Sequence, residues 1–125
     1  FDNIVNSSNP KTTKAYGRCV KNFDNDKWLS IVDLIAYDIV YQKFKSDDNI
    51  RDILMSTANA ILVEASPYDI IWGVGIGIND AKIYDMSKWR GTNILGYALM
   101  NVREQLKDEQ LKEEQLKKEQ LKDDV

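Results

Sequence analysis

Two carboxylates in the middle of the chain have a setting that suits acid–base chemistry. Glu64 directly follows three apolar residues, and Asp69 lies five residues later in a turn. Burial among apolar neighbours raises the pKa of a carboxyl group by desolvation, which suits a general acid or base. The pattern therefore predicts Glu64 as a catalytic residue. The structural alternative is an ion pair between Glu64 and one of three arginines, Arg18, Arg51 or Arg90.

Asp69 is the candidate for the second catalytic carboxylate. Hydrolysis of glycosidic bonds commonly uses two carboxyl groups, one to protonate the leaving group and one to activate water. Asp69 follows Pro67 and Tyr68, and aspartate is also an ordinary turn residue. Both interpretations of Asp69, catalytic and structural, stay open at this point.

Trp72 and Trp89 are candidates for contact with a flat ligand. An indole ring offers a rigid π-face for stacking, and Gly73 next to Trp72 permits close approach of a ligand to the backbone. Core packing is the alternative for both tryptophans. The glycines at 73, 75 and 77 lack the spacing of a dinucleotide-binding loop, which excludes that motif.

Gly91, Thr92 and Asn93 precede a predicted helix and form a candidate anion site. Free backbone N–H groups and the helix dipole favour phosphate at such a position, and Arg90 stands beside it. Arg18 is a second candidate phosphate ligand. The alternatives are plain helix capping by Thr92 or Asn93 and a bridge between helices by Arg18.

Composition removes several classes of function. The chain has 125 residues, enough for one core, and no histidine, which excludes Ser-His and Cys-His nucleophiles and most zinc sites. A net charge of -3 does not suit a nucleic-acid backbone, and no apolar run is long enough to span a membrane. The single cysteine, Cys19, cannot form an intramolecular disulfide. These features predict a soluble cytoplasmic protein with neither a nucleic-acid nor a membrane partner.

Capping residues and apolar spacing predict a mainly helical fold. Asn9 and Pro10 are typical of a helix start, and Asp24 or Asn25 can begin the longest core helix. That helix has a stripe of apolar residues at helical spacing: Trp28, Val32, Ile35 and Ile39. Further apolar residues on other sides predict that it is buried on more than one face: Leu29, Ile31, Ala36, Val40 and Phe44.

The remaining elements follow from similar signals. Ser46 or Asp47 can start a third helix, with an inward face formed by Ile50, Ile53 and Leu54. Residues 60–65 and 70–78 predict either a small hairpin or extended loops. Thr92 or Asn93 can start a last helix with one apolar face: Ile94, Leu95, Ala98, Leu99 and Val102. The expected fold is mainly α and multihelical, with a small extended or β patch and a long charged C-terminal helix.

Residues 107–125 are predicted as a separate charged tail. From Arg103 a five-residue unit repeats as REQLK, DEQLK, EEQLK and KEQLK. Five residues advance about 140° past a full helical turn, so the repeated leucines spiral around a helix and form no coiled-coil seam. Glu113 with Lys117 and Glu114 with Lys118 have the favourable spacing for ion pairs. The pattern favours a solvated single helix; an oligomerisation or partner-binding helix is the alternative.

Separated motifs in order resemble one known family. LVEASPYDIIWGVGI at 62–76, WRGTNILGYALMNVRE at 89–104 and AYGR at 15–18 are similar to the motifs of the NADAR family, the YbiA-like N-glycosidases. The resemblance covers residues 1–106 and implies a multihelical YbiA-like fold. It also implies that an additional N-terminal portion contributes to the pocket in the family. We therefore expect residues 1–106 to be an N-terminally incomplete NADAR domain.

The resemblance further implies a hydrolase that acts on a ribosyl N-glycosidic bond. The implied substrates are small molecules: phosphoribosylamino-pyrimidine intermediates of riboflavin synthesis or related ADP-ribosyl compounds, including an ADP-ribosylated base. No metal or organic cofactor is implied. Two alternatives from other classes stay open, a non-catalytic module that binds ADP-ribose or a nucleotide and a helical interaction protein that acts through its tail.

Overall fold

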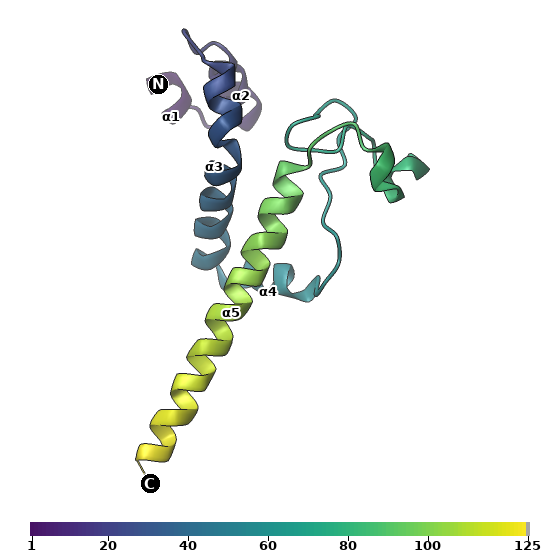
Figure 1. Ribbon diagram of the computed structural model, residues 1–125. Coiled ribbons are helices and arrows are strands. Elements are labelled where there is room, and N and C mark those ends of the chain that lie inside the picture. Colours follow the sequence, from purple (N-terminus) through teal and green to yellow (C-terminus); the bar gives the residue numbers. More distant parts are fainter. Residues whose placement is uncertain (125) are drawn as a thin grey trace. The chain divides into compact units, whose positions relative to one another are not determined.

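The computed structural model describes residues 1–124, which form two compact units (Figure 1). The first unit is Phe1–Ser30 and the second begins at Ile31. Each is described by itself below. Among residues 1–124, none of the helices combines the length and the apolar composition needed to cross a bilayer.

The first unit contains α1 (Asp2–Val5) and α2 (Pro10–Arg18), followed by the start of α3 (Asn25–Ser46). The side chain of Asn9 accepts hydrogen bonds from the backbone N–H groups of the first turn of α2, which confirms the predicted helix start. Asp24 Oδ1 likewise accepts from the N–H of Lys27 at 3.0 Å at the start of α3. None of residues 1–30 is fully buried, so local hydrogen bonds rather than a core define these helices.

In the second unit α3 buries one stripe only. Its buried residues are Val32, Ala36 and Val40, each four positions from the next. Ile39, which was predicted to face the core, is 59% exposed, and the prediction of burial on more than one side is wrong. The reason is that apolar residues occur on nearly every side of this helix. Periodicity therefore cannot select the buried side, and the packing partner selects it.

Helix α4 (Asp48–Ser56) starts where the sequence predicts. The side chain of Asp47 accepts from the N–H groups of Asn49 and Ile50, and Leu54 is buried. Ile53 is 66% exposed, so its predicted inward orientation is wrong. A helix of this length presents a narrow face to its partner, and Leu54 occupies it.

Helix α5 (Ile94–Asp123) contributes the other side of the core. Its predicted apolar face is confirmed, with Ala98 and Val102 buried and the other members packed against the core. The buried core cluster combines three helices: Ala36 and Val40 from α3, Leu54 from α4, and Ala98, Val102 and Leu106 from α5.

Arg103 is buried on the same helix. Its Nη1 donates to Thr57 Oγ1 at 2.7 Å and to the carbonyl of Ala60 at 3.0 Å. A buried guanidinium requires hydrogen-bond acceptors, and here they come from the segment that leaves α4. Arg103 therefore fixes the start of the long connection to α5.

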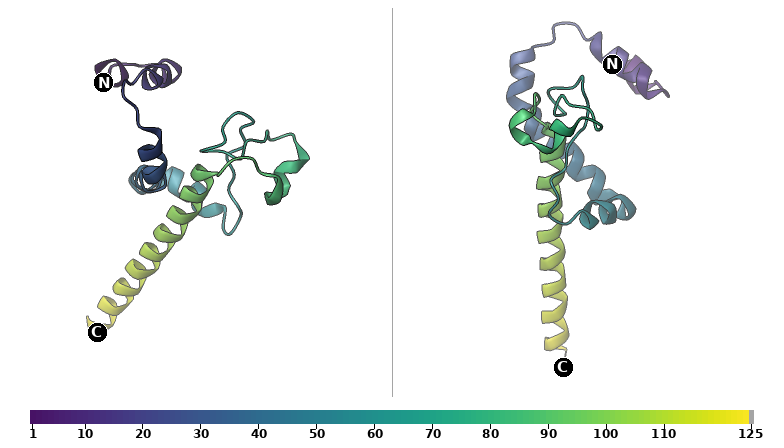
Figure 2. Two further views of the ribbon diagram at one scale, coloured as in Figure 1. Left: turned by 45° about the horizontal axis from the view of Figure 1, so that its top comes forward. Right: turned by 90° about the vertical axis from the view of Figure 1, so that its right-hand side faces the viewer.

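The connection between α4 and α5 contains no strand among the described residues. It has two short 3₁₀ turns, η1 (Ala81–Tyr84) and η2 (Met86–Lys88), and the rest is irregular. The predicted small hairpin is wrong, and the alternative of extended loops holds. Figures 1 and 2 show this segment running away from α4 and folding over the N-terminal end of α5.

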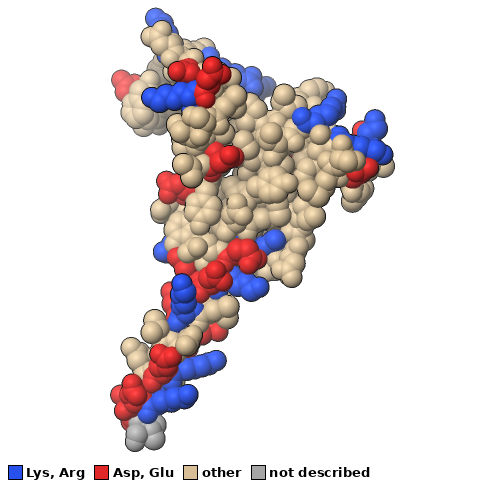
Figure 3. Space-filling model, viewed as in Figure 1, with Lys and Arg blue, Asp and Glu red and all other residues tan. Residues whose placement is uncertain are grey.

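The C-terminal half of α5 has a different surface. Leu111, Leu116 and Leu121 are all exposed, as expected for a spiral of leucines without a seam. Acidic and basic side chains line this part of the helix (Figure 3). The predicted Glu113–Lys117 and Glu114–Lys118 ion pairs do not form within residues 1–124. Instead, Gln110 donates to Glu114 and Gln115 donates to Glu119.

Candidate active site

The loop before α5 supplies acceptors for the first N–H groups of that helix and for the residues just ahead of it. Five successive backbone N–H groups donate to loop carbonyls at 2.9–3.2 Å. The pairs are Gly91 to Val74, Thr92 to Ile70, Asn93 to Gly73, Ile94 to Ile71 and Leu95 to Trp72. Helix N-termini need external acceptors because their first N–H groups have none within the helix. Residues 69–75 meet this need and are thereby fixed on the end of α5.

This arrangement corrects the predicted anion site at 91–93. That prediction required free backbone N–H groups at the helix start, and all five are occupied by carbonyls of the chain itself. Capping by a side chain is also absent, since the side chain of Asn93 makes no cap hydrogen bond. The helix dipole is complemented by backbone oxygen atoms instead.

Asn93 has another role, which sequence reasoning missed. It is fully buried in the left-handed backbone conformation, at φ 51°. Its Oδ1 accepts from the N–H of Glu64 at 3.0 Å, and its Nδ2 donates to the carbonyl of Leu62 at 3.0 Å. Asparagine is one of the few residues that tolerate this conformation. Its side-chain amide accepts from one backbone N–H and donates to one backbone carbonyl, as the backbone of a neighbouring strand would. Asn93 therefore fixes the segment that contains Glu64.

Glu64 is attached to the loop by its backbone and leaves its carboxylate unused. Its carbonyl accepts from the N–H of Val74 at 3.1 Å, and its side chain is half-buried. A Cβ atom placed on Gly73 would lie 2.8 Å from the Glu64 carbonyl oxygen and 3.2 Å from its Cγ. Gly73 thus permits the close packing of the loop against Glu64.

The predicted ion pair of Glu64 does not form with Arg51 or Arg90. Arg51 pairs with Asp48 at 2.7 Å, and Arg90 Nη2 donates to the carbonyl of Gly75. Within the described part of the second unit, no ion pair involves Glu64. Glu64 therefore combines a half-buried side chain and a fixed backbone with the lack of a salt-bridge partner in that part of the chain.

Asp69 holds the turn next to Glu64. Its Oδ1 accepts from the N–H groups of Ile71 and Trp72 at 3.0 and 2.8 Å, and its carbonyl accepts from Gly75 at 3.1 Å. These bonds give Asp69 a structural function that requires no ligand. Its role as the second catalytic carboxylate stays a prediction.

The two tryptophans have structural contacts of their own. Trp72 is half-buried and packs against the core cluster. Trp89 is half-buried, and its Nε1 donates to the carbonyl of Ile83 at 2.8 Å, which closes the two short 3₁₀ turns. Stacking of either ring on a ligand stays a prediction.

Gly91 is required for packing rather than for ligand approach. A Cβ at this position would lie 2.1 Å from the carbonyl oxygen of Gly73 and 2.8 Å from the Cα of Ile70. No side chain fits at that distance. The backbone of Gly73 and Ile70 therefore requires glycine at position 91, whereas the backbone of Glu64 and Asp69 requires it at position 73.

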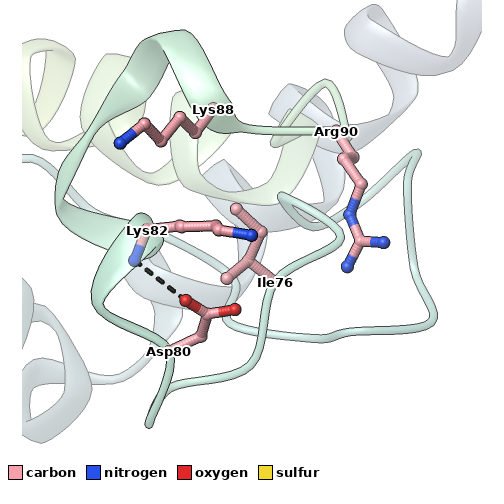
Figure 4. A pocket seen from close by; sticks show the side chains of 5 residues that line it. All are labelled: Ile76, Asp80, Lys82, Lys88 and Arg90. Atoms are coloured by element: carbon pink, nitrogen blue, oxygen red, sulfur yellow. Dashed lines mark hydrogen bonds between the residues drawn. The ribbon is translucent and has the colours of Figure 1, made fainter.

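An open cleft of about 460 Å³ lies beside this loop, lined by Ile76, Asp80, Lys82, Lys88 and Arg90 (Figure 4). Sequence reasoning named only Arg90 among these residues. The signal that was available is the presence of three cationic residues within a nine-residue stretch that otherwise forms turns. Arg18, the other predicted phosphate ligand, is exposed at the end of α2 in the first unit.

Comparison with known proteins places these motifs in a family. The model of the NADAR domain matches residues 1–107. An N-glycosidase of Acanthamoeba polyphaga mimivirus is 37% identical over 109 residues, with 84% of this chain and 62% of the relative covered. The N-glycosidase YbiA of Escherichia coli (strain K12) is 31% identical over 108 residues, with 86% and 61% covered.

A third relative has a different kind of name. Protein irg-1 of Caenorhabditis elegans is 37% identical over 109 residues, with 84% of this chain and 50% of the relative covered. The chain thus spans between half and about three-fifths of the length of these relatives. A family match over residues 1–107, together with Glu64, Gly73, Gly91 and Asn93 in one packed loop, shows that the chain belongs to the NADAR family.

Proposed function

We propose that this chain is an N-glycosidase, or the part of one that contains its catalytic carboxylate. The observation that supports this most is the half-buried Glu64, which lies on a backbone fixed by Asn93 and has no ion pair within the described part of the second unit. The names of two relatives, both N-glycosidases, support the same reaction class.

The proposed reaction is hydrolysis of a bond between ribosyl C1′ and nitrogen. Positive charge develops on the sugar as the bond to nitrogen breaks, and a nearby carboxylate stabilises it. Water attacks C1′ and gives a proton to the carboxylate, while the departing nitrogen takes up a proton, so that the products are the sugar with a hydroxyl at C1′ and the free base. The fixed backbone of Glu64, which is held at both the N–H and the carbonyl, supports this role. Asp69 Oδ1 is occupied, so we assign Asp69 the positioning of the turn at 69–72.

The proposed substrates are phosphoribosylamino-pyrimidine intermediates of the riboflavin pathway or related ADP-ribosyl compounds. We assign Trp72 and Trp89 as candidate walls for the base, and Arg90 as a candidate contact to the rest of the substrate. No metal or organic cofactor enters this proposal.

The first test compares the parent chain with Glu64→Gln. Glutamine keeps the shape but carries no charge and does not exchange a proton at neutral pH. We expect release of ribose 5-phosphate from the phosphoribosylamino-pyrimidine to fall about a hundredfold or more, with little change in substrate binding. Glu113→Gln, which removes an exposed carboxylate from α5, is the matched control and should leave the rate unchanged.

Three outcomes distinguish the candidates. Equal turnover by Glu64→Gln and the parent chain would exclude a catalytic role for Glu64. Binding of the substrate by the parent chain without release of sugar would favour the second candidate, a non-catalytic nucleotide-binding module. Deletion of residues 111–125 should leave turnover intact, whereas loss of function on that deletion would favour interaction through the tail.

A further inference from the structure

We propose that the cleft lined by Lys82, Lys88 and Arg90 binds a phosphate group. Three cationic side chains and one carboxylate, Asp80, line an open volume of about 460 Å³ around Ile76. Figure 4 shows Lys82 and Lys88 extending from the two 3₁₀ turns and Arg90 from the segment that follows them. A phosphate monoester carries close to two negative charges at neutral pH, which matches the net charge of these lining residues.

Arg90 is the fixed member of the cluster. Its backbone N–H donates to the carbonyl of Val74 at 2.9 Å, and its Nη2 donates to the carbonyl of Gly75. The guanidinium group has five N–H donors, so these contacts leave others for an oxyanion. Pre-organised arginine loses less conformational entropy on binding a phosphate than a free side chain does.

Lys82 and Lys88 supply the other two positive charges that line the cleft. Both are exposed, and the contact of their side chains recorded among residues 1–124 is an ion pair of 3.5 Å between Lys88 and Asp85. Lysine in this situation acts as a point charge that adapts to the ligand.

The two carboxylates in this region are engaged with the backbone. Asp80 Oδ1 accepts from the N–H of Lys82 at 3.0 Å, as Figure 4 shows. Asp85 Oδ1 accepts from the hydroxyl and the N–H of Ser87, and these bonds hold the pKa of Asp85 below its usual value. Each carboxylate thus serves a turn, and the three cations retain an excess of positive charge.

The cleft is connected to the candidate catalytic residue through Val74. The N–H of Val74 donates to Glu64, and the carbonyl of Val74 accepts from Arg90. A sugar phosphate bound with its phosphate at Arg90 would therefore contact the same loop to which Glu64 is hydrogen-bonded. This assignment of a phosphorylated sugar rests on the proposed function, whereas binding of phosphate does not.

The direct test is an NMR titration of the full chain with inorganic phosphate at constant ionic strength. We expect shifts of the amide signals between residues 76 and 90, and about tenfold weaker binding in each of Lys82→Gln and Lys88→Gln. Lys107→Gln removes an exposed charge from α5 and is the matched control. A double variant combines Lys82→Gln and Lys88→Gln. Equal binding of phosphate by the parent chain and this double variant, or shifts at lysines throughout the chain, would overturn the proposal.

The same titration with ribose, ribose 5-phosphate and ADP-ribose separates recognition of the phosphate from recognition of the sugar. We expect both phosphorylated probes, but not ribose, to shift the signals and to lose affinity in the double variant. Shifts by ribose of the same size and with the same variant dependence would contradict a phosphate site. Turnover lost in Glu64→Gln with phosphate binding intact would separate the two proposals, as would turnover retained in a variant that no longer binds phosphate.

Discussion

The two halves of α5 show how the same helix can be specified in two ways. Up to Leu106 the helix contributes to the core, and its first N–H groups donate to a loop from elsewhere in the chain. Beyond Glu109 the leucines are exposed and the hydrogen bonds between side chains are local. The first half depends on tertiary contacts and the second on helix propensity alone. Variants that alter only the tertiary contacts or only the solvated half of α5 test this difference.

The largest effect is expected for Gly96→Ala in the first half. A Cβ there would lie 2.2 Å from the carbonyl oxygen of Leu62 and 2.4 Å from Asn93 Nδ2. Since the nearest atom is backbone, we expect a loss of about 3 kcal/mol in the free energy of unfolding, measured by urea denaturation. Gly17→Ala is the control, because nothing lies within 4 Å of its Cβ, and it should stabilise α2 slightly. Similar effects of the two substitutions would contradict the close packing.

Leu106 and Leu111 form the sharpest pair, since both occupy the same position of the five-residue repeat. Leu106 is 5% exposed and Leu111 is 56% exposed. Leu106→Ala should lower the free energy of unfolding by about 3 kcal/mol, because it leaves a cavity among buried neighbours. Leu111→Ala should change it by no more than about 0.5 kcal/mol. A large effect at Leu111 would indicate that the C-terminal half has a partner in solution.

Asn93 tests the connection between the helix and the loop. Asn93→Ala removes two hydrogen bonds and leaves the N–H of Glu64 and the carbonyl of Leu62 unpaired, which should cost about 2 kcal/mol. Asn93→Gly removes the same bonds but tolerates the positive φ without strain. The difference between the two variants in urea denaturation therefore measures the backbone strain. If both variants were as stable as the parent chain, the two hydrogen bonds of the Asn93 side chain would contribute nothing to stability.

The smallest expected effect is on the pKa of Lys45, which lies close to Glu109, where the two halves of α5 meet. The pKa of Lys45 is raised, first by the hydrogen bond between Lys45 Nζ and Tyr41 Oη at 2.8 Å and then by the charge of Glu109 on α5. A raised pKa in the folded state means that the stabilisation is present below the unfolded pKa, about 10.4. It is lost as the pH rises through the higher folded-state pKa.

Tyr41→Phe removes the hydrogen bond and should lower the pKa of Lys45, as measured by NMR titration of its side chain. Tyr37→Phe is the control, because Tyr37 stacks on Tyr41 but is not the hydrogen-bond partner of Lys45. If the pKa of Lys45 is the same in Tyr41→Phe as in the parent chain, the hydrogen bond is not its main cause.

The sequence by itself determined the features that depend on near neighbours. Asn9, Asp24 and Asp47 cap the helices that they were predicted to start, because a capping side chain bonds to N–H groups within three residues. The exposure of the tail leucines followed from the period of the repeat. The family followed from motif residues in order, and the family model matched them.

Only the tertiary structure decided which side of α3 is buried and what occupies the start of α5. Both depend on contacts between residues far apart in the chain: Ala36 and Val40 face the core while Ile39 is exposed, and loop carbonyls rather than an anion meet the N–H groups of 91–95. Backbone carbonyls exist at every residue, so the sequence pattern contains no sign of which ones will serve as acceptors. The role of Asn93 and the cluster of Lys82, Lys88 and Arg90 were hidden for the same reason, since each depends on the path of a loop without regular periodicity.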